Sequence, residues 1–172
     1  QQAPAPMPEP APQPEPAPAP KPLDTSDGTV KSSILETGAY EAMAKLMVDD
    51  NLLQRFVVFT TNLADQELAA NHEFLKPPKQ KFRVYRQAGK EWIDTASYKR
   101  YTTYVEALES VNTDALIKIY HQYKPAIAKI YAEIGSGDDF DDALIEAINN
   151  LLDTPEVPMP VEVHTESVMY KY

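Results

Sequence analysis

The sequence of 172 residues contains no cysteine and only five glycines. The absence of cysteine excludes disulfide bonds, thiolate metal sites, iron–sulfur clusters and cysteine nucleophiles from this chain. No apolar run approaches the roughly 20 residues that a membrane-spanning helix needs, and no secretory signal peptide is recognisable. Nucleophile-elbow, phosphate-loop and dinucleotide-binding signatures are also missing. Because no catalytic constellation remains, we predict a protein that is not an enzyme.

Positive charge is scarce as well: 16 basic residues stand against 26 acidic ones, which gives a net charge of −10. This balance argues against nucleic acid as a partner of the whole molecule. The three histidines, His72, His121 and His164, lie far apart and form no H-E-x-x-H pattern. We therefore expect no metal site and no cofactor.

Proline is concentrated at one end, since ten of the 16 prolines fall in residues 1–22, at every even position from Pro4 onward. Such spacing excludes a helix and favours polyproline II. We predict a linker over 1–22, on the order of 70 Å long, and a globular domain over 23–172. An inert terminus and a proline-rich ligand are the alternatives. The linker and a first residue other than Met lead us to expect a membrane anchor upstream.

Helical spacing of apolar residues dominates the remainder of the sequence. It predicts a mainly α fold, a single compact domain of about six helices, over 26–38, 43–48, 52–70, 96–111, 113–134 and 140–152. Pro125 lies inside the longest of these and predicts a kink there or a break into two helices. Phe56 and Ile148, each in the middle of an apolar stripe, should both be buried.

The segments whose apolar residues follow a strand-like pattern are short. A β-hairpin is predicted near 81–94, with its turn at Gln87–Lys90 and one glycine at the bend. Alternation of apolar residues predicts short C-terminal strands, one at Val161 and Val163, another at Val168, Tyr170 and Tyr172.

Two groups of residues each allow a structural and a functional interpretation. The acidic group fits capping of a helix start better than calcium, because it lacks the alternating ligands of a calcium loop. It comprises Asp138, Asp139, Asp141 and Asp142. The aromatic group has the spacing of a packed core, with a sugar-binding site as the alternative. It comprises Tyr98, Tyr101, Tyr120 and Tyr123.

The most informative feature is the charge of residues 76–100, where eight basic residues and two acidic ones give a local net charge of +6. Basic residues interleaved with aromatic ones are typical of an anion-recognition surface. The candidate binding residues are Lys79, Lys81, Arg83, Arg86, Trp92, Lys99 and Arg100. Protection of a strand edge is the competing interpretation, and a contact with the acidic C-terminal third is another.

Several separated segments resemble one bacterial family. They are RFVVFTTNLA (55–64), FLKPPKQKFRVY (74–85), YKRYTTYVEALESVN (98–112), LIEAINNLLDTPEVPMPVEV (144–163) and the terminal VMYKY. Together they are similar to the domain of unknown function 3014, found in Gram-negative envelopes. The resemblance implies a membrane segment, a proline-rich linker and then this domain. It implies no activity, cofactor or catalytic residue.

We therefore expect a non-catalytic, membrane-tethered domain on the periplasmic face of a Gram-negative inner membrane. Its basic hairpin would bind another protein or an anionic envelope component. The alternative is a small-ligand-binding domain with a tyrosine-lined pocket beside Pro125.

Overall fold

A computed structural model describes residues 22–68, 71–134, 139–165 and 170–171. The proline-rich segment 1–21 lies outside these residues, as do Asp138, Val168 and Tyr172. The described residues form seven helices and four short strands. In chain order these are α1 (Asp27–Leu35), α2 (Tyr40–Leu46), α3 (Leu52–Ala64), β1 (Val84–Gln87), β2 (Lys90–Ile93), α4 (Thr95–Lys99), α5 (Thr102–Glu109), α6 (Thr113–Ile134), α7 (Phe140–Leu152), β3 (Glu162–Thr165) and β4 (Tyr170–Lys171).

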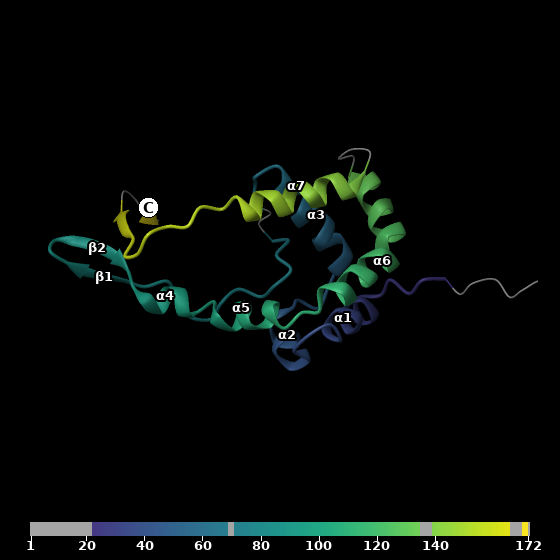
Figure 1. Cartoon of the computed structure of the whole chain (residues 1–172), viewed down its shortest axis with the longest axis horizontal. Coiled ribbons are helices and arrows are strands. Elements are labelled where there is room, and N and C mark those ends of the chain that lie inside the picture. The colour runs from purple at the N-terminus through teal and green to yellow at the C-terminus, as the bar shows by residue number, and fades with distance from the viewer. Residues whose placement is uncertain (1–21, 69–70, 135–138, 166–169, 172) are drawn as a thin grey trace, which may run out of the picture.

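The prediction of a mainly α fold with a hairpin and short C-terminal strands is confirmed. The helix count differs by one because the helix expected over 96–111 is two helices, α4 and α5, separated at Arg100 and Tyr101. Pro125 does not break α6, which is continuous over 22 residues. Tyr123 and Ile127, on either side of Pro125, are both buried in the core. Its axis curves in Figure 1.

Helix α3 lies at the centre of the helical body and packs against α1, α6 and α7. Its apolar stripe provides Leu52 and Val57, both 0% exposed. The start of α3 is capped by α1: the Asp27 carboxylate accepts hydrogen bonds from the backbone N–H groups of Asn51 and Leu52, each at 2.7 Å. This cap satisfies donors that a helix start otherwise leaves unpaired.

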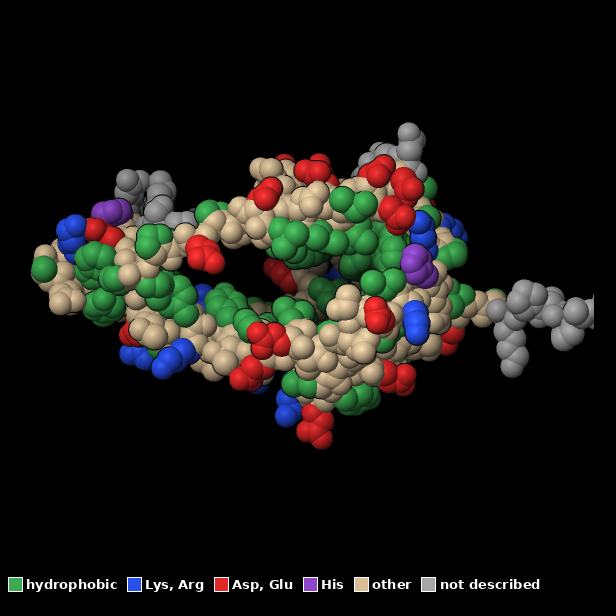
Figure 2. Space-filling model, viewed as in Figure 1, with side chains coloured by type: hydrophobic (Ala, Val, Ile, Leu, Met, Phe, Trp, Pro, Cys, Tyr) green, Lys and Arg blue, Asp and Glu red, His purple; other side chains and the backbone are tan. Residues whose placement is uncertain are grey.

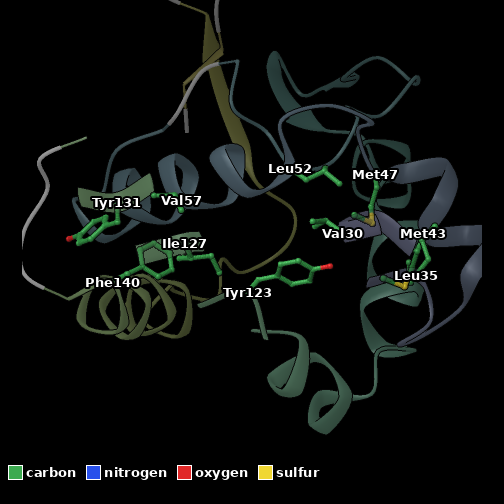
Figure 3. Packing of buried hydrophobic residues seen from close by; sticks show 11 residues of the cluster. Val30, Leu35, Met43, Met47, Leu52, Val57, Tyr123, Ile127, Tyr131 and Phe140 are labelled. Atoms are coloured by element: carbon green, nitrogen blue, oxygen red, sulfur yellow. The ribbon is translucent and has the colours of Figure 1, made fainter. Parts of the chain in front are cut away.

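Helices α3 and α7 run in parallel. Near their starts, the rings of Phe56 and Phe140 make an edge contact with centroids 5.6 Å apart. At their ends, the Asn150 amide donates to the carbonyl oxygens of Leu63 and Ala64, both at 3.0 Å. Figure 3 shows the resulting core, in which Tyr123 points from α6 toward the side chains of α1 and α2.

The expectation that Phe56 and Ile148 are both buried is half right. Phe56 is partly buried against the core cluster, but Ile148 is 45% exposed. On α7 it is Phe140 and Ala147 that face the core. Periodicity showed correctly that α7 is amphipathic, yet its apolar stripe is wider than the surface that α3 and α6 cover.

The strands form one antiparallel sheet in the order β1-β2-β3-β4. This sheet lies at one end of the long axis, away from the helical body, and is reached through α4 and α5 on one side and residues 153–161 on the other (Figure 1). An opening separates these two connections (Figure 2). None of the described helices is both long and apolar enough to cross a membrane.

The core assignment predicts a large difference between two identical substitutions. Leu52→Ala should lower the free energy of unfolding by about 2–5 kcal/mol, because it removes a fully buried side chain. Leu68→Ala should change it by less than about 0.5 kcal/mol, because Leu68 is 91% exposed. Urea denaturation of both variants measures this, and equal losses would contradict the assignment.

Candidate anion-binding surface

The hairpin is built on the two-residue turn Ala88-Gly89, in which both residues have positive φ values of 53° and 76°. Turns of this kind match the twist of paired strands. The turn fixes the register, so that Tyr85 lies opposite Trp92 and Arg86 opposite Glu91. The predicted hairpin and its turn are confirmed.

A short network fixes the chain that enters the hairpin. The Ser97 hydroxyl on α4 accepts a hydrogen bond from the backbone N–H of Arg83 at 2.7 Å and donates to its carbonyl at 2.8 Å. The Asp94 side chain caps α4 by accepting from the N–H of Ala96 at 2.8 Å. Residue 83 is thereby held beside α4, and its side chain remains exposed.

Arg100 links the same two segments through aromatic rings. Its guanidinium carbon lies 5.6 Å from the ring centre of Phe82 and 4.9 Å from that of Tyr101. Both distances suit cation–π attraction. The Arg100 Nε is buried and has no hydrogen-bond partner among the described residues. The positive charge of Arg100 is thus held between two rings, without an acidic partner in the described chain.

Three cations of this region are neutralised within the chain. Lys76 pairs with Asp49 at 3.2 Å, Arg86 with Glu91 at 2.7 Å, and Lys90 with Glu162 at 2.8 Å. The last pair joins the hairpin to the acidic C-terminal third. Such a contact was one of the alternatives that the sequence allowed. The Lys90 ammonium also lies 5.9 Å from the Trp92 ring centre.

The candidate residues therefore fall into two groups. Arg86 and Trp92 contact other side chains of the sheet, since Arg86 pairs with Glu91 and the Trp92 ring lies beside Lys90. Four exposed side chains form no ion pair with any described residue, and together with Arg100 they make up what we term the basic end: Lys79, Lys81, Arg83 and Lys99. Figure 2 shows Lys and Arg side chains gathered below the sheet, where Figure 1 places α4.

A family model described as "Protein of unknown function (DUF3014)" matches residues 52–172. The chain belongs to this family. No curated protein and no solved structure matches the chain. The family description names no activity, so membership in DUF3014 assigns no catalytic role to any residue.

The DUF3014 match begins at Leu52, the first residue of α3, whereas the folded body begins earlier. Helices α1 and α2 contribute Val30, Leu35, Met43 and Met47 to the core. Asp27 caps α3 itself. A DUF3014 fragment cut at residue 52 would therefore lack part of its own core.

The other candidate groups do not converge on a site. Tyr123 is buried in the core, and the Tyr120 hydroxyl donates a hydrogen bond to Asp141. Tyr98 and Tyr101 are exposed at the other end of the molecule. The prediction that all four tyrosines are packed in the core is therefore wrong for Tyr98 and Tyr101. A hollow does lie beside Pro125, lined in part by Ala126 and Lys129, and no tyrosine is among its lining residues.

The acidic group serves as structure at the start of α7. Asp139 caps this helix, as predicted, by accepting a hydrogen bond from the N–H of Asp141 at 2.9 Å. Asp141 in turn accepts hydrogen bonds from Lys124 and Tyr120 of α6. Among the described residues, no three His, Asp or Glu side chains are grouped as metal ligands would be.

Sequence reasoning did not find the contacts made around the basic end by Glu91, Ser97, Glu162 and Phe82. Two of them had a usable signal. A two-residue turn at 88–89 dictates that Arg86 faces Glu91. Asp94 stands directly before α4, and an Asp at that place indicates a helix cap. The cap fixes where α4 begins and so places Ser97 in its first turn. The contacts of Glu162 and Phe82 depend on how distant segments meet.

The Asp141 contacts predict a specific pH dependence. Hydrogen bonds from Lys124, and secondarily from Tyr120, hold the pKa of the Asp141 carboxyl below its usual value. Because the pKa is lower in the folded chain, Asp141 stabilises the fold above its unfolded pKa of about 3.9. That contribution is lost as the pH falls through the folded pKa.

Asp141→Asn should therefore lower the melting temperature at neutral pH, and the difference from wild type should shrink as the pH falls below about 4. The matched control is Asp142→Asn, which removes the same charge from an exposed neighbour. Melting temperatures across the pH series measure both. A difference that stays constant at all pH values would contradict the Asp141 assignment.

Proposed function

We propose that this DUF3014 chain is a non-catalytic, membrane-tethered envelope domain whose basic end binds an anionic component of the envelope. The observation that carries the proposal is a set of exposed cations with no acidic partner among the described residues, Lys79, Lys81, Arg83 and Lys99. They occur in a molecule whose net charge is −10. Unpaired charges of one sign, gathered at one end, create a local field that attracts a partner of opposite sign.

Protection of a strand edge accounts for few of these cations. The edge strand of the hairpin is β1, and the one basic residue that β1 itself carries is Arg86. Arg86 is neutralised by Glu91. The unpaired cations precede β1 or lie on and just after α4, where they cannot shield the strand's exposed hydrogen-bonding groups. Binding is therefore the better explanation of their charge.

The surroundings of these cations favour a lipid headgroup surface as the anionic component. Two hollows formed by the described residues lie elsewhere, one near Tyr40 and Thr103, the other near Gln54 and Lys129. Phe82, Tyr85 and Tyr98 are each 37% exposed among the basic residues. Partly exposed aromatic rings suit the boundary of a membrane, and each Lys or Arg near an anionic leaflet contributes about 1 kcal/mol.

The tether belongs to the same proposal. The described chain enters at α1, at the opposite end of the long axis from the sheet (Figure 1). A proline-rich spacer on the order of 70 Å would let the domain present its far end to a surface while it stays attached. The proposal accordingly includes a position at the periplasmic face of an inner membrane.

The small-ligand alternative has less support. The hollow beside Pro125 is lined by side chains such as Gln54, Lys129 and Glu133 and contains no tyrosine. A buried apolar pocket with a few convergent polar groups, which small-ligand sites usually require, is not what these residues form.

Charge reversal tests the proposal. The triple variant Lys79→Glu, Lys81→Glu, Arg83→Glu should lose binding to phosphatidylglycerol vesicles, because it inverts the basic end. The matched control reverses three exposed lysines of the helical body, Lys45, Lys118 and Lys129, so both variants have the same net charge. Circular dichroism should show both folded, since exposed charges contribute under about 1 kcal/mol.

Vesicle co-sedimentation over a salt series is the measurement, with phosphatidylcholine vesicles as the uncharged reference. Wild type and control should bind phosphatidylglycerol, and binding should weaken as the screening length falls below roughly 8 Å. Equal loss in both variants would show that only total charge matters. Failure of wild type to bind, with capture of an envelope protein instead, would replace the lipid surface by a protein partner.

A further inference from the structure

Strand β1 is paired on one side only. It pairs with β2, and in the sheet order β1-β2-β3-β4 no other described strand lies beside it. A strand at the edge of a sheet presents backbone donors and acceptors that have no partner in the sheet. We call the side of β1 that faces away from β2 the outer edge. It is a surface on which a further strand can pair.

The hydrogen bonds of the hairpin show which backbone groups point outward. The N–H of Asp94 donates to the carbonyl of Arg83 at 3.0 Å, whereas the N–H of Ile93 donates to the carbonyl of Val161, next to β3, at 2.9 Å. In an antiparallel pair, successive residues alternate between these two directions. Val84 lies opposite Ile93, so its N–H and C=O point away from β2. Among the described residues, none is hydrogen-bonded to these two groups.

The outer edge lacks several features that usually protect an edge strand. Strand β1 contains no proline, and its pairing with β2 continues without a bulge from Val84 to Gln87. The one cation that the strand carries, Arg86, pairs with Glu91. Prolines, bulges and unpaired charges are the usual means of preventing strand addition. Their absence from β1 favours an edge that pairs with a strand from another molecule.

The outer edge is held in an extended conformation before any partner arrives. The two-residue turn at Ala88-Gly89 fixes one end of β1. At the other end, the Ser97 hydroxyl bonds to both the N–H and the carbonyl of Arg83. The extended backbone therefore continues to the residue before β1. A partner strand meets a backbone that is already ordered, which lowers the entropic cost of binding.

The charges beside the outer edge determine the chemistry of its partner. Lys79, Lys81 and Arg83 come directly before β1, and none of them forms an ion pair with a described residue. A second copy of the chain is a poor partner, because pairing two β1 strands would bring two basic ends together. The proline-rich segment 1–22 is a poor partner too, because proline has no N–H to donate to a ladder. An acidic segment of another protein meets both requirements.

The side chains of the hairpin favour apolar residues in the middle of this segment. Tyr85 lies opposite Trp92 on one side of the sheet and is 37% exposed. Val84 lies opposite Ile93 on the other side. Cross-strand contacts between β-branched and aromatic side chains stabilise paired strands. The segment that fits best therefore has β-branched residues in its middle and acidic residues beside them.

We propose that the outer edge of β1 binds an extended acidic segment of another protein by strand addition. The segment pairs its backbone with Val84 and places its carboxylates next to Lys81 and Arg83. The inference goes beyond the proposed function, because it uses the backbone of β1 as well as the cations of the basic end. A lipid surface and the acidic segment compete for these cations.

A peptide titration tests the proposal. The probe is a short peptide in which Val and Thr alternate between acidic ends, and its control has the same charge but proline in place of the central residues. Fluorescence anisotropy should show that wild type binds the probe, and binds the control at least about tenfold more weakly, because proline cannot donate to β1. In nuclear magnetic resonance spectra, the Val84 amide should exchange more slowly when the probe is bound. The amide of Tyr85, which pairs with Trp92 in the ladder, should change little.

Val84→Pro removes the outward N–H from the protein itself, at the first residue of an edge strand, where proline is tolerated. It should bind the probe about tenfold more weakly than the matched variant Val84→Ala does. Both variants should bind phosphatidylglycerol vesicles equally, because lipid headgroups do not pair with a backbone.

Two results with wild type would overturn the proposal, and neither bears on vesicle binding. One is that the probe and its proline control bind equally or that neither binds. The other is that the Val84 amide becomes protected as the concentration of wild type alone rises, which would show a second copy at the outer edge.

Discussion

The packing of α3 is the constraint on which the rest of the structure depends. Leu52 and Val57 are fully buried because α1, α6 and α7 surround them. Since α3 ends at Ala64 and α7 runs parallel to it, the last turn of α7 has no helix beneath it. The chain then crosses open space to reach the sheet. Beyond α7, residues 153–161 connect the helical body to the sheet, which lies apart from it (Figure 1).

This separation also determines what the two ends can do. Acidic residues lie at the surface of the helical body. One of them, Asp141, forms an ion pair with Lys124. At the sheet, Glu91 and Glu162 neutralise the cations of the hairpin itself. Among the described residues, the cations beside the hairpin have no such partners. We propose that an anionic surface supplies the opposite charge.

Local signals in the sequence were sufficient for much of the fold. The hairpin register follows from the Ala88-Gly89 turn, and the start of α7 from Asp139. What failed was the assignment of buried faces. Ile148 and Tyr101 lie on true apolar stripes, but periodicity shows only which residues share a face, and whether another element covers that face depends on distant packing. For the same reason the sequence could not show which basic residues form ion pairs. Lys90 pairs with Glu162 because β3, which is distant in sequence, lies beside the hairpin.

The central claim is that an anionic envelope surface binds the basic end and no other part of the molecule. Amide hydrogen exchange with and without phosphatidylglycerol vesicles tests this directly on the intact chain, because it reports protection along the whole backbone. The account predicts slower exchange in residues 79–87 and in α4, with α3 and α6 unchanged. Protection that appears in the helical body instead, with exchange at residues 79–87 unaffected, would contradict it.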